Sequence, residues 1–593
     1  MQSFKFILQY LKNYKYRYFA GVLTLFIVDF MNLLIPKITG TIIDGLTLNS
    51  FNMKKVYIYI VYIIFVGAVI SIGRFFWRFF IMGAARKIEK KIRNDMFNHL
   101  EKMSVEYFNK HKAGDLMTRF LSDLTAVRKS IGPAVISTFD ATVMTLMVII
   151  QMMIYVNIKL TLIAVIPMFL ICVSEIYYGK IMEKRFKQSQ EAISSMADFV
   201  QESFSGVRVI KAFVRERAEF KKFSKANLLS KQKNLSVFRL QAVVMPLLDV
   251  IIGLSSLITL IYGGYLALIG EITLGKFVAF NQYVSMLVWP MLACGETVTM
   301  LSQGWASLKR IKALFDEKPE IFDKENVENI ERIKGKIEFK NLTFTHKGDR
   351  EATLSNINIK VEAGTTLAII GKTGNGKSTL VNLLLHLYNA DDGMIFIDDK
   401  DINSISLKTL RGNIAYVPQD NFLFSNTLKS NIAFGVENEE MENIKRATIA
   451  ACIHDNIVDF PEGYETIVGE RGVTLSGGQK QRSSIARALM KDAPILILDD
   501  ALSAVDTSTE ESILKNLKEN RKGKTTILIA HRISTIKNAD IIMVLDNGKI
   551  REIGSHNELI NNNDIYKDMF EKQQLEEEFE KREKNIDKDV SDI

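Results

Sequence analysis

A glycine-rich loop is the first part of the sequence whose residue types and spacing indicate chemistry. A short apolar segment, 366–370, is typical of a strand that runs into the loop, and a helical pattern follows it. This order of strand, loop and helix is the context of a P-loop, whose backbone N–H groups and helix N-terminus surround phosphate oxygens. The residues predicted to bind the phosphates of a nucleotide are Gly371, Lys372, Thr373, Gly374, Asn375, Gly376, Lys377, Ser378 and Thr379.

Four side chains are expected to act on those phosphates. Lys377 is expected to reach the β- and γ-phosphates, and the Ser378 hydroxyl to ligate Mg²⁺. A second apolar strand, 495–498, ends in Asp499 and Asp500. A carboxylate at the end of such a strand supports Mg²⁺ through its water shell, which assigns Asp499 to the metal. Asp500 is then placed to orient an attacking water, so the predicted chemistry is hydrolysis of a nucleoside triphosphate such as ATP.

A second helix start suited to phosphate lies between these two motifs. It is followed by a basic helix, 480–489, and serine and glycine at a helix N-terminus leave backbone N–H groups free for an anion. The chain thus carries two such sites but only one complete P-loop. We therefore expect this segment to act on a nucleotide held by another chain. Its residues are Leu475, Ser476, Gly477, Gly478 and Gln479.

The elements that must position these residues fall into two halves of opposite charge. The chain has 593 residues and a net charge of +9, but residues 1–315 carry +20 and residues 316–593 carry −11. The basic half also holds the long apolar segments, so membrane topology explains the basic excess better than nucleic-acid binding does. Only 3 Cys and 9 Pro in a chain that is 48% hydrophobic exclude a disulfide-stapled fold and a disordered chain.

Six apolar segments before residue 303 are each long enough to span a membrane, which takes about 17–25 residues. They exclude a soluble protein of DNA repair or translation. The long connections 83–133 and 179–241 carry 11 and 14 Lys and Arg, which predicts that both connections and both chain ends are cytoplasmic. The six segments are 18–35, 56–73, 134–156, 160–178, 242–269 and 277–302.

The long connections also have helical periodicity, so the spans are expected to continue as helices into the cytoplasm. Short helices are expected at the two tips, near 107–114 and 204–217. Within the spans, Asp29, Asp249 and Glu296 lie deep in apolar surroundings, where charge is costly and usually faces a cavity or a partner. These three residues are candidates for a substrate pathway, with pairing between helices as the alternative.

These motifs, in this order, resemble an ATP-binding cassette (ABC) exporter half-transporter over about residues 1–572. The resemblance implies that Gln419 in Val-Pro-Gln-Asp ligates Mg²⁺, and that it takes part in catalysis with Asp500 and His531. It also assigns Asp506 to the D-loop and 469–472 to a segment that touches the partner's coupling helix. The implied ligands are ATP and Mg²⁺, and the implied partners are a second half-transporter, the lipid bilayer and a small-molecule substrate, with no nucleic acid.

Two residues depart from the pattern of this family. His346 stands where an aromatic residue, often Tyr, usually stacks on adenine, so we expect weaker packing on adenine without loss of binding. Asp500 stands where the family usually has Glu as catalytic base. The shorter side chain is expected to slow hydrolysis at this chain's own P-loop, because a misplacement of about 1 Å can cost roughly 10²-fold in rate.

Residues 475–479 match the signature segment of this family. An intact signature segment together with Asp500 resembles one subunit of the heterodimeric bacterial multidrug exporters. The function implied is ATP-driven export of small amphipathic or hydrophobic compounds across the cytoplasmic membrane by alternating access, as one half of a heterodimer. Two alternatives stay open: a homodimeric lipid flippase or exporter, and an ATP-gated channel or sensor that transports nothing uphill. In the homodimer, Asp500 would be a slow but working base.

The expected fold class is an α-helical six-span transmembrane domain with long cytoplasmic helical extensions, followed by an α/β P-loop nucleotide-binding domain. The expected divisions are an interfacial elbow helix (1–17), the transmembrane domain (18–315), a linker (316–335), the nucleotide-binding domain (336–572) and a charged tail (573–593).

Overall fold

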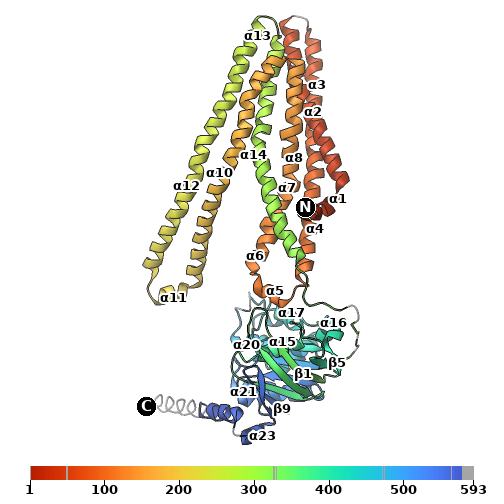
Figure 1. Ribbon diagram of the computed structural model, residues 1–593, viewed down its shortest axis with the longest axis vertical. Helices are drawn as coiled ribbons and strands as arrows, with labels where there is room; N and C mark the ends of the chain where they lie inside the picture. The colour runs from red at the N-terminus through yellow and green to blue at the C-terminus, as the bar shows by residue number, and fades with distance from the viewer. Residues whose placement is uncertain are drawn as a thin grey trace. The chain divides into compact units, whose positions relative to one another are not determined.

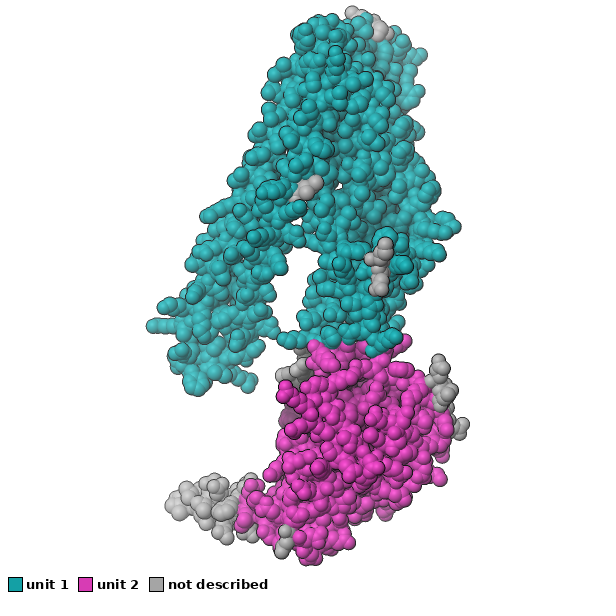
Figure 2. Space-filling model, in the orientation of Figure 1, with its two compact units in different colours: residues 1–101, 111–318 teal, residues 102–110, 319–593 magenta. Residues whose placement is uncertain are grey.

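The computed structural model divides into two compact units. One contains residues 1–101 and 111–318, and the other contains residues 102–110 and 319–593 (Figure 2). The second unit thus combines the acidic half of the sequence with the tip of the first long connection. The structure describes residues 2–48, 51–324, 327–328, 330, 332–437, 439–469, 472, 474–562 and 564–576.

Six long apolar helices make up the first unit, as the sequence predicts (Figure 1). They span Lys15–Thr47, Met53–Leu100, Ala113–Tyr155, Ile158–Ser205, Glu216–Leu268 and Leu274–Asp316. Several are composite, and their parts are α2 (Lys15–Thr47), α3 (Met53–Trp77), η1 (Arg78–Met82), α4 (Gly83–Leu100), α6 (Ala113–Thr118), η2 (Arg119–Asp123), α7 (Leu124–Ile131), α8 (Pro133–Phe139), η3 (Asp140–Met144), α9 (Thr145–Tyr155), α10 (Ile158–Ser205), α12 (Glu216–Ile258), η4 (Thr259–Gly263), α13 (Gly264–Leu268) and α14 (Leu274–Asp316).

Short helices also lie at both tips, where the sequence predicts them. They are α5 (Val105–Lys110) and α11 (Val207–Ala212). α10 and α12 run side by side as one antiparallel pair that α11 closes (Figure 1). The four η segments in this unit are π-helical, a local widening of the helix that the sequence analysis did not predict.

A short amphipathic helix precedes the first span. α1 (Gln2–Lys12) ends five residues before the expected boundary, and α2 already begins at Lys15. The Tyr10 hydroxyl donates a hydrogen bond to Asp95 Oδ2 at 2.9 Å, and the rings of Phe6 and Phe315 lie 5.3 Å apart. These contacts fix α1 against α4 and α14.

Two sheets form the second unit. A parallel sheet with one antiparallel edge strand has the order β10-β9-β3-β8-β7-β6, and a smaller antiparallel sheet has the order β2-β1-β4-β5. The core strands β3, β7 and β8 are nearly or fully buried. One face of this sheet packs against the smaller sheet and a helix, and the other face packs against helices. The strands are β1 (Ile337–Phe344), β2 (Leu354–Val361), β3 (Thr366–Ile370), β4 (Ile395–Ile397), β5 (Lys400–Asp401), β6 (Ile414–Val417), β7 (Ile495–Asp499), β8 (Thr525–Ile529), β9 (Ile541–Asp546) and β10 (Lys549–Gly554).

The helices of this unit connect those strands, and three of them start at functional motifs. They are α15 (Lys377–Leu384), η5 (Ile402–Ser404), α16 (Leu407–Gly412), α17 (Leu428–Ala433), α18 (Met441–Ala450), α19 (His454–Val458), η6 (Gly463–Glu465), α20 (Gly477–Met490), α21 (Thr507–Asn520), α22 (Ile533–Ile536) and α23 (His556–Asn561). Residues 565–576 are helical as well.

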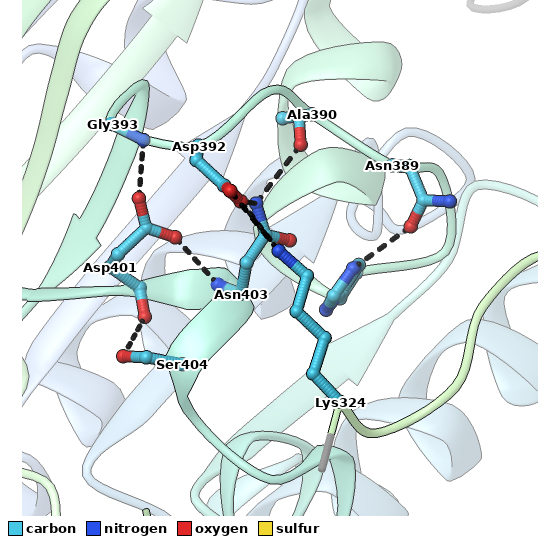
Figure 3. Close-up of polar contacts among 9 residues, drawn as sticks. Lys324, Asn389, Ala390, Asp392, Gly393, Asp401, Asn403 and Ser404 are labelled. Carbon is cyan, nitrogen blue, oxygen red and sulfur yellow. Dashed lines mark hydrogen bonds and ion pairs between the residues drawn. The ribbon is translucent and has the colours of Figure 1, made fainter. Parts of the chain in front are cut away.

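The segment expected to be a linker is held against the nucleotide-binding domain. Lys324 Nζ lies 2.8 Å from Asp392 Oδ1, and that oxygen also accepts a hydrogen bond from Asn403 Nδ2 at 2.8 Å (Figure 3). Asp323 Oδ1 accepts a hydrogen bond from the backbone N–H of Leu407 at 2.7 Å. The described part of this segment beyond Lys318 therefore packs against the nucleotide-binding domain.

Candidate functional site

The P-loop has the backbone that its glycines predict. It leaves β3 and enters α15, with Gly376 at φ +87° as the residue before the helix. A Cβ on Gly376 would lie 2.9 Å from the Thr353 carbonyl oxygen, and one on Gly371 would lie 2.2 Å from that of Leu545. Neither position has room for a side chain, because the loop packs tightly against neighbouring backbone.

Two side chains hold the P-loop in place: Lys377 by hydrogen bonds within the loop, and Asn375 by a hydrogen bond to a neighbouring strand. The buried Lys377 ammonium donates hydrogen bonds to the carbonyl oxygens of Gly371 at 2.7 Å and Lys372 at 2.9 Å. Burial lowers its pKa, while Asp499 and Asp500 act in the opposite sense. Asn375 Nδ2 donates to the Leu545 carbonyl at 2.9 Å, which ties the loop to β9. The ammonium thus lies in the concave side of the loop, as a phosphate-binding lysine must.

The predicted hydrolytic residues gather around one cavity of about 180 Å³. Asp499 is 2% exposed at the end of β7. Burial raises the pKa of its carboxyl, and the Ser378 hydroxyl acts in the opposite sense. The cavity is lined by Thr353, Thr373, Gly374, Gly376, Lys377, Ser378, Thr379, Gln419, Asp499, Asp500, Ile529 and His531. The fold therefore brings both carboxylates, Gln419 and His531 to the P-loop from separate parts of the chain.

The donor set of this cavity fits Mg²⁺. Ser378, Gln419 and Asp499 supply only oxygen ligands, which Mg²⁺ prefers. In the part of the chain that the structure describes, no group of three or more His, Cys, Asp or Glu could hold a metal ion. Mg²⁺ usually needs just one or two protein ligands, because substrate phosphates and waters complete its shell.

The backbone of Asp500 is held at three points. Its N–H donates to the Ile529 carbonyl at 2.9 Å, and its carbonyl accepts from Ser503 Oγ at 3.0 Å and from Gln481 Nε2 at 3.4 Å. The residue has φ +50°, a left-handed conformation that Asp adopts more readily than most residues. The position of its carboxylate is therefore set by a rigid backbone and by the length of the side chain.

The loop that carries His531 is held by two residues that no motif identifies. Gln573 Nε2 donates to the His531 carbonyl at 2.7 Å, and its Oε1 accepts from the Ile533 N–H at 2.7 Å. On the other side, the buried carboxylate of Glu510 accepts from the Thr535 hydroxyl. Gln573 is the first residue of the segment expected to be a charged tail, and its side chain supports the loop that carries His531.

The signature segment starts α20 with a reciprocal cap. The Ser476 hydroxyl accepts from the Gln479 N–H at 3.3 Å, and Gln479 Oε1 accepts from the Ser476 N–H at 3.0 Å. One turn on, Gln481 Oε1 accepts from the Ala504 N–H at 2.8 Å. None of residues 475–479 lines the cavity at the P-loop. Gln481 links α20 to the D-loop and to Asp500, a contact that the sequence does not signal.

His346 and Asp506 each have neighbours that define a local role. His346 Nε2 lies 3.3 Å from Thr379 Oγ1, and its ring lies 5.0 Å from the ring of Tyr388. Asp506 is the N-cap of α21, where hydrogen bonds from Ser508 and Thr509 hold the pKa of its carboxyl well below its usual range. His346 thus lies beside the P-loop, where its ring could stack on the adenine of a bound nucleotide. Asp506 caps a helix.

The three candidates for a substrate pathway have different surroundings. Asp29 is 4% exposed, and its Oδ2 has no hydrogen-bond partner among the described residues. Asp249 and Glu296 are exposed. In the segment expected to touch a partner's coupling helix, Glu470 and Arg471 lie outside the described residues.

Family models match both parts of the chain. The ABC transporter transmembrane region matches residues 18–291, and the ABC transporter model matches residues 354–503. A Bacillus subtilis protein named as a probable multidrug resistance ABC transporter ATP-binding/permease protein, YheI, is 38% identical over 95% of this chain and 97% of its own. The chain belongs to the ABC transporter family.

Further relatives place both parts of the ABC transporter in one polypeptide. The multidrug resistance-like ATP-binding protein MdlA of Escherichia coli is 35% identical over 97% of each chain. The structure of a bacterial Atm1-family ABC exporter with ATP bound matches with a TM-score of 0.77 and 26% identity, over 94% of this chain and 98% of that one. This ABC transporter chain is thus an exporter half-transporter, with its spans and its ATPase domain fused.

Proposed function

We propose that the chain exports small amphipathic or hydrophobic compounds across the cytoplasmic membrane, as one half of a heterodimer. Two observations support the proposal. The P-loop, Gln419, Asp499, Asp500 and His531 line one cavity, and six long apolar helices precede this domain in the sequence. The names of YheI and MdlA, which describe multidrug resistance, support the class of cargo.

The residues of the cavity divide the work of hydrolysis. Lys377 neutralises phosphate charge from the concave side of the loop, and backbone N–H groups of the loop hold the phosphates in place. Ser378, Gln419 and Asp499 would hold Mg²⁺, which supplies neutralisation of charge on the phosphate oxygens. Asp500 orients the attacking water, and His531 faces the same cavity to stabilise charge on the transferred phosphate.

Transport would follow from closure of two nucleotide-binding domains on ATP. Ser476 and the glycines after it would face the nucleotide of the partner, since these residues do not line this chain's own cavity. The tip helix α5 falls in the same compact unit as the nucleotide-binding domain, which suits it to transmit closure to the spans. The spans would then switch between inward-facing and outward-facing states.

The heterodimer follows from an asymmetry in this chain. Its signature segment is intact and capped, but Asp500 is one methylene shorter than the usual Glu and cannot advance on its fixed backbone. We propose that this chain completes an active site on its partner and hydrolyses its own ATP slowly. Both long basic connections and both termini would be cytoplasmic, by the excess of Lys and Arg in those connections.

The cargo would pass along the inner faces of the spans. Asp29 is the favoured contact for a cationic group, because it is buried with one carboxylate oxygen free of hydrogen bonds among the described residues. Asp249 and Glu296 are exposed in the single chain. We propose that they join the pathway only when a second half-transporter packs beside them.

Uphill transport by the purified complex tests this proposal. Proteoliposomes with outward-facing nucleotide-binding domains should accumulate a fluorescent amphipathic cation on addition of ATP and Mg²⁺, and Lys377→Ala should abolish accumulation. Equilibration without accumulation would indicate a channel or sensor instead and contradict the proposal.

A lipid flippase is the second candidate. The ATP-dependent lipid A-core flippase of Syntrophus aciditrophicus is 36% identical over 80% of this chain and 78% of its own. A fluorescent phospholipid added to the same proteoliposomes separates the two functions. ATP-dependent movement of that lipid between leaflets, without uptake of the cation, would favour the flippase.

A further inference from the structure

A cavity of about 720 Å³ lies beneath the amphipathic helix α1. Its volume falls in the range of small-molecule sites, roughly 300–1,000 Å³. Three elements close it: α1 with the start of α2, the junction of α7 and α8, and the cytoplasmic part of α14. Its lining is Phe4, Ile7, Leu8, Leu11, Lys12, Lys15, Tyr18, Val127, Ser130, Ile131, Val135, Leu301, Gly304, Trp305 and Leu308. This site is separate from the nucleotide cavity and from the acidic residues of the spans.

The helix that roofs the cavity is held in place by contacts outside it. The Tyr10 hydroxyl bonds to Asp95, and Phe6 packs on Phe315. The Tyr18 hydroxyl also donates to the Ile131 carbonyl at 2.8 Å, and both of these residues line the cavity. The cavity is therefore a built feature of the fold, because the roof is anchored at points that do not depend on anything inside.

The floor is shaped by a close approach of α7 and α14. A Cβ on Gly304 would lie 2.3 Å from Cβ of Ser130, so glycine allows these helices to come together. Leu8 and Trp305 line the cavity and still keep 42% and 38% of their surface exposed. The apolar lining is thus accessible from outside, as a site for a chain-like apolar ligand requires.

Positive charge marks one side of this apolar cavity. Lys12 and Lys15 are the only charged residues of its lining, and no carboxylate of a described residue lies within 4.0 Å of either ammonium group. Lys15 Nζ lies 5.0 Å from the ring centre of Tyr16. An apolar body beside two uncompensated ammonium groups matches a molecule with a hydrocarbon chain and an anionic head.

We propose that this cavity binds one anionic phospholipid, with an acyl chain against Leu8, Leu11 and Trp305 and its phosphate at Lys12 and Lys15. α1 is an amphipathic helix of the type that lies at the membrane surface, so a lipid reaches the cavity from the adjoining leaflet. Each lysine near the surface contributes a preference for anionic lipid of about 5-fold, and the two together about 25-fold.

Quenching of Trp305 fluorescence tests this site directly. The chain has 3 Trp, so Trp77→Phe and Trp289→Phe leave Trp305 as its single Trp, and the Trp residues of the partner are replaced by Phe as well. The complex is reconstituted in unlabelled phosphatidylcholine. Two titrations are then compared, one with rising fractions of brominated phosphatidylglycerol and one with rising fractions of brominated phosphatidylcholine. Brominated phosphatidylglycerol should quench Trp305 saturably, at a mole fraction about 25-fold lower than brominated phosphatidylcholine.

Matched variants separate a site from general attraction to the membrane. Lys12→Gln with Lys15→Gln should bring the two quenching curves together. Lys5→Gln should change neither curve, because Lys5 lies on α1, is exposed and does not line the cavity. In the unaltered lysine background, high salt should also reduce the preference, which checks the charge term without a substitution at these positions.

Three results would overturn the proposal. Equal quenching by the two brominated lipids would indicate ordinary contact with acyl chains. No quenching by either lipid would mean that something else covers the cavity, such as a second chain or the transported compound. An unchanged preference in the double lysine variant would remove the lysines as the headgroup site.

Discussion

Asp500→Glu should accelerate hydrolysis at this chain's own P-loop. The backbone of residue 500 is fixed by hydrogen bonds to Ile529, Ser503 and Gln481, so the short side chain cannot be compensated by a shift of the main chain. The added methylene advances the carboxylate by about 1 Å, and a displacement of that size is worth roughly 10²-fold in rate. We therefore expect hydrolysis at this site to rise by up to about 10²-fold.

The assay must report on this site alone. Phosphate release is measured in a single turnover from the purified complex, with the partner's P-loop lysine substituted so that only this chain hydrolyses ATP. Lys377→Ala added to Asp500→Glu should remove the gain, while Asp500→Asn should lie at or below the rate of the natural chain. A rate that does not rise in Asp500→Glu, with nucleotide affinity intact, would refute the argument that side-chain length limits this site.

Three other predictions concern residues around the same site. Ser476→Ala should remove a helix cap worth about 1 kcal/mol and depress hydrolysis of ATP at the partner's P-loop, as site-resolved trapping would show; full activity would contradict the shared site. In the Asp500→Glu background, Gln573→Ala should slow turnover by up to about 30-fold through the loss of two hydrogen bonds to the His531 loop, with ATP affinity unchanged, whereas the exposed neighbour Gln574→Ala serves as the silent control. Asp506→Ala should lower the unfolding temperature at pH 7, and the gap in unfolding temperature to the natural chain should shrink as the pH falls below 3.8, the ordinary pKa of Asp. The reason is that a pKa lowered by folding stabilises the fold above the ordinary pKa, and this stabilisation is lost as the pH falls through the lowered pKa. A gap independent of pH would exclude the capping carboxylate as its source.

The architecture was predictable because its signals are long or strongly patterned. Six apolar segments predicted the spans, the helical periodicity of the two long connections predicted the tip helices, and the P-loop with the strand before Asp499 predicted the nucleotide-binding domain. The motif residues Lys377, Gln419, Asp500 and His531 line one cavity in the structure. Their meeting could be expected because the carboxyl ends of parallel strands share one edge of a sheet.

The residues that support the site could not be predicted in the same way. Gln573 contacts a loop 42 residues away, and Gln481 reaches Ala504 23 residues along the chain. Both are single glutamines in helices. No sequence pattern distinguishes Gln573 from the exposed Gln574 beside it. The end of α1 at Lys12 was also missed, because the helical pattern runs on into the first span. Side-chain contacts across the tertiary fold decide such features, and local patterns do not contain them.

The segment 319–335 illustrates a related limit. Its charged composition is typical of a linker, but Asp323 and Lys324 each find a partner on the surface of the nucleotide-binding domain. Such surface contacts are individually worth little. Near the end of the segment, Ile333 is 3% exposed in the core of the domain and Ile330 packs beside it, so apolar burial adds to these surface contacts.

We propose that this chain is one half of an asymmetric ATP-driven exporter. The most direct test is to express the tagged chain with its neighbouring genes, extract it in detergent, and measure the intact mass of the complex together with its ATPase rate. We expect a 1:1 complex with a second half-transporter, whose ATPase persists in Asp500→Asn. A complex of two identical chains with robust ATPase that Asp500→Asn abolishes would contradict it, because Asp500 would then be a competent base.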